Sequence, residues 1–226
     1  MLKPRRRLTK KEVKQDKFVT TVLKLWALTR ERYKEMGAGV LGVLALIAIL
    51  NMWAGHQRRR EAQAWELLAE AQAAWVQGDT SGASGTYEEV MERFWGTKAA
   101  ARACLALGDI ALSKGLYDEA EEAYRRCLRK YGKDDVLAFA ATSGIGVCLE
   151  DRGRYEEAAD LYREFARRHP ESPLSPEVLW KAAWCLEQAG KLEEAKEVLR
   201  GLLAKYPDAP NRYKVRRRLK TLEGLG

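Results

Sequence analysis

The apolar and small residues after position 60 recur in four similar segments. Each segment contains a glycine, and successive glycines are 37, 38 and 37 residues apart: Gly78, Gly115, Gly153 and Gly190. Five residues after each glycine stands an alanine, nine after it a tyrosine or leucine, and seven before it an alanine or glycine. These positions are Ala83, Ala120, Ala158 and Ala195; Tyr87, Tyr124, Tyr162 and Leu199; and Ala71, Gly108, Gly146 and Ala183. The chain is therefore internally repetitive.

Each segment predicts a helical hairpin. The glycine permits the chain reversal between two helices. Small residues on both helices allow close approach, and the large residue fills the space beside them. Because one hairpin cannot bury its own apolar face, stacked neighbours must do so. The pattern predicts an all-α solenoid in a domain at 56–226, with repeats at about 64–97, 101–134, 139–172 and 176–209.

The two ends of this array differ from its middle. In the first repeat, residues 81–85 read SGASG, which is poor helix material, so its second helix is predicted to start late or fray. After Pro210, an apolar stripe of Val215, Leu219 and Leu222 runs among basic residues. This pattern predicts a helix at 211–223 that caps the last repeat.

A different pattern precedes the repeats. Residues 37–55, GAGVLGVLALIAILNMWAG, contain no charged residue. A helix needs ~20 apolar residues to cross a bilayer, so the segment predicts a single transmembrane helix. A buried helix of a soluble protein and a cleaved signal peptide are the alternatives, although no A-x-A-like cleavage site follows.

The net charge of +8 belongs to residues 1–36, which hold 12 basic and 4 acidic residues, whereas the rest of the chain holds 28 of each. A balanced domain argues against a nucleic-acid partner. In the tail, Phe18, Val22 and Leu25 predict a basic amphipathic helix, suited to anionic lipid or to a cytoplasmic partner such as ribosomal RNA. The positive-inside rule predicts a single-pass topology, with residues 1–36 cytoplasmic and the repeats on the far, extracytoplasmic side.

The repeats resemble the tetratricopeptide family over about residues 64–207. The second repeat matches best, with Leu107-Gly108, the turn glycine Gly115, and then Tyr117, Ala120 and Tyr124. The resemblance implies a groove that holds peptides, lined by the first helix of each hairpin. The residues it places there include Trp65, Leu68, Trp75, Arg102, Asp109, Glu150, Trp180 and Trp184. Packing of Trp180 and Trp184 on a neighbouring repeat or on the capping helix is the alternative.

Residues for catalysis are sparse. The two histidines, His56 and His169, have no metal-ligand spacing, and no C-x-x-C occurs among the four cysteines. We therefore expect no enzyme, cofactor or metal. Cysteines in repeat helices are commonly small apolar fillers. Antiparallel packing would bring Cys104 near Cys127, which makes this pair a candidate disulfide in an oxidising compartment.

A short basic tail, one span and translocated repeats look like the ancillary subunit of the bacterial Sec translocon. That resemblance implies a location in the bacterial inner membrane with the repeats in the periplasm. It also implies a scaffold that contacts the translocon, chaperones or client polypeptides during export. Outer-membrane assembly and cell-division coordinator proteins are also similar, and so, with inverted topology, are cytosol-facing import receptors.

Overall fold

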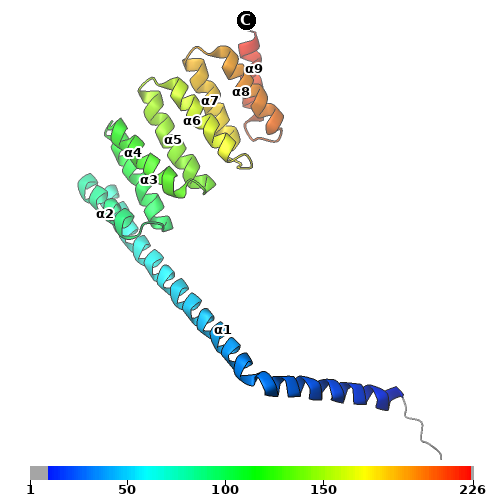
Figure 1. The fold of residues 1–226 in the computed structure, drawn as a ribbon. Helices are drawn as coiled ribbons and strands as arrows, with labels where there is room; N and C mark the ends of the chain where they lie inside the picture. Colours follow the sequence, from blue (N-terminus) through cyan, green and yellow to red (C-terminus); the bar gives the residue numbers. More distant parts are fainter. Residues whose placement is uncertain (1–9, 225–226) are drawn as a thin grey trace, which may run out of the picture. The chain divides into compact units, whose positions relative to one another are not determined.

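A computed structural model describes the backbone of residues 10–224, and side chains at 20–22, 38–39 and 41–224. The helices of this part of the chain are drawn in Figure 1. They are α1 (Lys10–Val76), α2 (Thr80–Arg93), α3 (Lys98–Ser113), α4 (Tyr117–Tyr131), α5 (Asp135–Asp151), α6 (Tyr155–Arg168), α7 (Ser175–Gln188), α8 (Leu192–Lys205) and α9 (Arg212–Glu223). Two compact units result, Met1–Arg58 and Arg59–Gly226. We call the second unit the repeat domain.

The first unit contains the predicted membrane span. Within the described residues, no helix is both long enough and apolar enough to cross a membrane. The predicted span at 37–55 includes positions 37 and 40, whose side chains lie outside the described residues, as do those of Phe18 and Leu25. Large hydrophobic side chains between Leu41 and Trp53 are exposed; Met52, for example, is 78% exposed.

The repeat domain is an all-helical solenoid, as the repeat pattern predicts. The turn glycines Gly78, Gly115, Gly153 and Gly190 have φ between 69° and 85°, the left-handed conformation that closes each hairpin. The other repeated positions are buried. Tyr124 and Tyr162 are 1% and 0% exposed, and the alanines five residues after each glycine are at 0%.

The buried tyrosines are held between neighbouring helices. A Cβ on Gly108 of α3 would lie 2.5 Å from Cε1 of Tyr124, and one on Gly144 of α5 would meet the same ring. The ring of Tyr124 on α4 therefore occupies space that only glycines on both flanking helices leave free. Gly146 and Tyr162 make the corresponding contact between α5 and α6.

The second helix of the first repeat corrects the sequence-based expectation. It begins at Thr80 and includes Gly82 and Gly85. The carboxylate of Asp79 accepts a hydrogen bond from the Gly82 backbone N–H at 2.8 Å. This side-chain cap stabilises the first turn, so the helix begins directly after Asp79 and not later. Ala83 and Tyr87 are buried in the core, which offsets the weak propensity of the glycines.

The solenoid curves with its odd-numbered helices inside. Helix α3 contacts α5, and α5 contacts α7, whereas within the described residues the even-numbered helices make no comparable contacts with one another. The inner row of a curved array is the one whose members lie closest together. We therefore call the exposed side of residues 59–76, α3, α5, α7 and α9 the concave face, and that of α2, α4, α6 and α8 the convex face.

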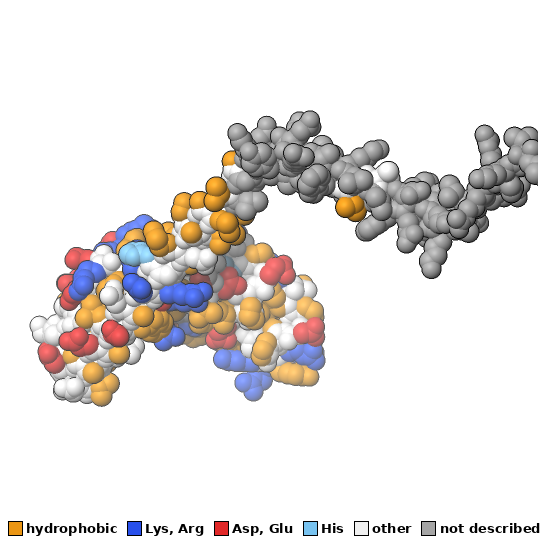
Figure 2. Space-filling view, turned by 90° about the horizontal axis from the view of Figure 1, so that it is seen from below, with side chains coloured by type: hydrophobic (Ala, Val, Ile, Leu, Met, Phe, Trp, Pro, Cys, Tyr) orange, Lys and Arg blue, Asp and Glu red, His pale blue; other side chains and the backbone are white. Residues whose placement is uncertain are grey.

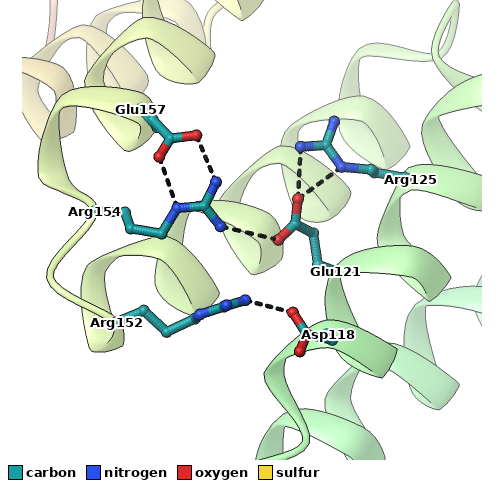
Figure 3. Close-up of polar contacts among 6 residues, drawn as sticks. All are labelled: Asp118, Glu121, Arg125, Arg152, Arg154 and Glu157. Atoms are coloured by element: carbon teal, nitrogen blue, oxygen red, sulfur yellow. Dashed lines mark hydrogen bonds and ion pairs between the residues drawn. The ribbon is translucent and has the colours of Figure 1, made fainter.

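Ion pairs join the turn of one repeat to the preceding repeat (Figure 3). Arg154, between the turn glycine Gly153 and the start of α6, contacts Glu157 of α6 at 2.6 Å and Glu121 of α4 at 3.9 Å. Arg152 pairs with Asp118 of α4 at 2.5 Å. Lys191 repeats the arrangement one repeat later and contacts Glu156 at 3.1 Å. These exposed pairs fix the relative position of successive turns more than they add stability.

Helix α9 closes the array. Val215 and Leu222 are 0% and 2% exposed, and the helix packs on α8. The Asn211 side-chain amide donates to the Pro176 carbonyl oxygen at 3.3 Å, so the start of α9 also lies against α7. Most of the basic side chains of α9 are exposed, as expected of a capping helix.

Candidate functional site

The concave face carries a series of cations placed over aromatic rings. The guanidinium of Arg102 on α3 lies 5.2 Å from the ring centroid of Trp65 on α1. The ammonium of Lys181 on α7 lies 5.8 Å from the ring centroid of Phe139 on α5. Lys214 on α9 lies 4.4 Å from that of Trp180 on α7. In each case a cation reaches back to the preceding odd-numbered helix, within the range of cation–π attraction.

Three tryptophans predicted to line this face are partly exposed: Trp65 at 37%, Trp75 at 40% and Trp184 at 40%. Trp184 packs edge-on against Tyr155, with ring centroids 5.9 Å apart, and is otherwise partly exposed. Trp180 is half-buried beneath Lys214. Trp180 thus packs against the capping helix, whereas Trp184 remains open to a partner.

Leu68 does not line any surface. It is 1% exposed and belongs to the core that also contains Tyr87 of α2 and Ala99 of α3. The family pattern assigns it to the groove, but in this chain α2 and α3 pack around it. Its role is therefore structural.

The predicted acidic positions of the concave face already accept internal hydrogen bonds. Asp109 accepts from the Tyr124 hydroxyl at 2.5 Å, and Glu150 accepts from Tyr162 at 2.8 Å and from the Cys185 thiol at 3.4 Å. Burial, together with the hydrogen bond to Asp109, raises the pKa of Tyr124 above its usual range. These carboxylates position the buried tyrosines and are less available to a ligand than their number suggests.

The cations of this face make fewer internal polar contacts than its carboxylates. Within the described residues, none of Arg102, Lys181 and Lys214 pairs with a carboxylate. The Lys181 ammonium lies over the rings of Phe139 and Tyr162 and donates to the Ser143 hydroxyl at 3.4 Å. The concave face therefore combines open aromatic surface with available positive charge. The sequence-based prediction does not include Lys181 and Lys214. Family positions describe the groove residues of a single repeat, whereas these two side chains contact aromatic rings on the preceding odd-numbered helix.

The four cysteines are buried free thiols. Cys104 and Cys127 do lie together: the Cys104 thiol donates to the Ala123 carbonyl oxygen at 3.2 Å, and the Cys127 thiol faces the Ala101 carbonyl oxygen at 4.0 Å. The interaction between the two thiols lowers the pKa of Cys104 and, with burial, raises the pKa of Cys127. A disulfide between them stays a prediction. No cluster of metal-ligating side chains occurs in the described part of the chain.

Comparison with known proteins agrees with this architecture. Residues 7–217 match the tetratricopeptide repeat protein 21 C-terminal ARM domain. The chain belongs to this ARM-domain family. No curated protein matches it.

Solved structures with the same fold as this ARM-domain chain are distant in sequence. A tetratricopeptide repeat protein from Parabacteroides merdae is 17% identical, with a TM-score of 0.54, over 71% of this chain and 60% of that one. The apo form of RapI is 13% identical, with a TM-score of 0.54, over 72% and 63%. The nearly identical TPR-like repeats of a putative kinesin light chain from Podosopora anserina are 16% identical, with a TM-score of 0.53, over 73% and 88%.

The chain thus covers less than two thirds of the first two of these proteins. At such identities the likeness shows the fold alone. TPR-like repeats are typical of non-catalytic scaffolds that bind other proteins.

Proposed function

We propose that this protein is a membrane-anchored scaffold whose concave face binds a segment of another protein. The observation that carries the proposal is the exposed tryptophan surface beside unpaired cations, centred on Trp65 with Arg102 and on Trp184 near Lys181. Tryptophan and arginine are the residues most enriched among interface hot spots. Isolated apolar side chains on a surface need no partner, but aromatic side chains repeated along one curved face favour one.

The chemistry of the face selects the kind of segment. Open aromatic rings favour apolar side chains, and cations without carboxylate partners favour acidic ones. Asp109 and Glu150 each hold a tyrosine hydroxyl, which uses part of their capacity to bind a basic side chain but leaves their charge in place. The ligand class is therefore an apolar peptide segment that carries acidic residues. Nucleic acid is a poor fit, because acidic and basic side chains are intermixed on the face shown in Figure 2.

The cellular setting rests on the sequence. The uncharged stretch at 37–55 supports anchoring in the bacterial inner membrane, and the exposed hydrophobic side chains between Leu41 and Trp53 need an apolar cover. The basic tail supports a cytoplasmic N-terminus on anionic lipid, with the repeats on the far side. In that setting the scaffold assists protein export, envelope assembly or chaperone contact at the translocon.

Co-purification from membranes in mild detergent, followed by mass spectrometry, tests the proposal. The translocon channel or periplasmic chaperones are the expected partners. Trp184→Ala should reduce their recovery about tenfold or more, in line with a hot-spot loss of ~2 kcal/mol. Trp95→Ala is the matched control, because Trp95 is 39% exposed but follows α2 and packs on Tyr131.

Two results would refute parts of the proposal. If Trp184→Ala lowers the melting temperature sharply while partner recovery is unchanged, Trp184 packs the fold and does not bind. If only cytosolic chaperones or targeting factors are recovered, the topology is inverted and a cytosol-facing receptor replaces the export scaffold.

A further inference from the structure

A groove of about 650 Å³ opens on the convex face between α6 and α8. Its floor is apolar and is formed by side chains from three helices and the turn that follows α8: Ala166, Leu179, Val198, Leu202 and Tyr206. The volume falls in the range of sites that accept several side chains of a ligand. Curvature explains the opening, because helices on the outside of a curved array diverge.

One residue of this groove breaks the repeat pattern. Eleven residues after the turn glycine, the first three repeats carry long charged side chains: Glu89, Arg126 and Glu164. The fourth repeat carries Gly201 at this position, and Gly201 lines the groove. The surface that a charged side chain covers in the other repeats is therefore bare in α8.

Nothing in the described part of the chain accounts for this glycine. Its φ is not positive, and a Cβ placed on it would meet no atom within 4 Å. A glycine inside a helix lowers helix stability relative to alanine, so the position is unfavourable for folding alone. Gly108, Gly144 and Gly146 differ, because buried tyrosines occupy the space beside them. A helix-interior glycine without an internal neighbour is suited to close approach by an external backbone.

The rim of the groove is mainly basic. Arg163, Arg167 and Lys205 stand around the apolar floor, against one acidic residue, Asp160. Arg163 contacts Asp160 at 3.4 Å and Glu194 at 3.9 Å, and Arg167 pairs with Glu164. These pairs are exposed and exchange easily for carboxylates of a ligand. Lys205 has no carboxylate partner in the described part of the chain and lies over the Tyr206 ring.

From these observations we infer that the convex groove between α6 and α8 binds an amphipathic helix of a partner protein, with an apolar stripe flanked by acidic residues. A helix lies naturally along a groove between two helices, and Gly201 allows its backbone to come close. The basic rim fixes the sign of the flanking charges. The site is separate from the concave face and does not depend on the function proposed for it.

The test uses the purified full chain in mild detergent and two fluorescent helical peptides with the same leucine stripe, one flanked by glutamates and one by lysines. Fluorescence anisotropy should show binding of the acidic peptide and at least tenfold weaker binding of the basic one. Gly201→Trp fills the groove from an open position and should weaken the acidic peptide at least tenfold. Gly201→Ala is the matched control: it should raise the melting temperature by about 2–4 °C and keep binding within a few-fold.

Lys205→Glu supplies a second variant that leaves the groove open, and it should weaken the acidic peptide while improving the basic one. Trp184→Ala should leave this binding unchanged, which separates the result from the test of the concave face. Equal binding by Gly201→Trp and the unmodified chain, equal affinity for both peptides, or no binding of the acidic peptide at 1 mM (roughly the weak limit of specific binding) would each overturn the inference.

Discussion

Replacing Gly108 by alanine tests whether glycines set the spacing between repeats. The new Cβ would lie 2.5, 2.7 and 2.8 Å from three ring atoms of Tyr124, far inside van der Waals contact. The ring cannot move away, because Gly144 of α5 borders it on another side and its hydroxyl is hydrogen-bonded to Asp109. Overpacking of this kind costs up to ~3 kcal/mol. Alanine returns ~1 kcal/mol through better helix propensity.

The expected net loss is therefore about 2 kcal/mol, or a melting temperature lower by about 4–8 °C for a domain of this size. Thermal unfolding followed by circular dichroism measures it. Gly85→Ala in α2 is the matched control, since its Cβ meets nothing within 4 Å and its melting temperature should rise. Adding Tyr124→Leu to Gly108→Ala should lose less than the sum of the two single changes, because the smaller side chain makes room. A rise in melting temperature for Gly108→Ala equal to that of Gly85→Ala would refute the reasoning.

Two further predictions concern the thiols and the ion pairs. Burial raises the pKa of Cys148 to about 11. Alkylation by iodoacetamide at pH 8, followed by mass spectrometry, should therefore be slow in the folded protein and rapid in denaturant. Rapid labelling of the native protein would show that the core is open. Arg154→Ala should lower the melting temperature at low salt and much less in 1 M salt, because Arg154 links two repeats and salt screens its ion pairs. Arg167→Ala is the control, since its partner Glu164 lies on the same helix. In the same salt series it should lower the melting temperature less than Arg154→Ala does.

The sequence carried most of the information about the fold of the repeat domain, because turn glycines and small helix-contact residues have local and unambiguous physical requirements. Gly78 and Gly190 adopt positive φ, and Ala83 and Ala195 are fully buried, as their positions in the repeat predict. The start of α2 differs from the prediction because helix propensity alone leaves out the side-chain cap. Asp79 was the available signal, three residues before the Gly82 N–H that it accepts from.

The candidate site was less predictable, because exposure depends on neighbours that lie a whole repeat away. Leu68 and Trp65 are three residues apart on one helix, yet one is in the core and the other is open. Trp180 is covered by Lys214, a residue that the sequence assigns only to a basic helix end. This contact depends on how α9 packs against α7, and the residue spacing within the fourth repeat does not predict that packing.

The same size asymmetry that builds the fold also creates its two candidate binding faces. The odd-numbered helices bury mostly small residues, such as Ala100, Cys104 and Gly108 on α3, so they pack closely and form the inner row. The even-numbered helices bury Tyr124, Tyr162 and Phe165, which hold their axes apart. Divergence on that side opens grooves between α4 and α6 and between α6 and α8. Long charged side chains line the first of these, whereas the bare backbone at Gly201 leaves the second open to close approach by another helix.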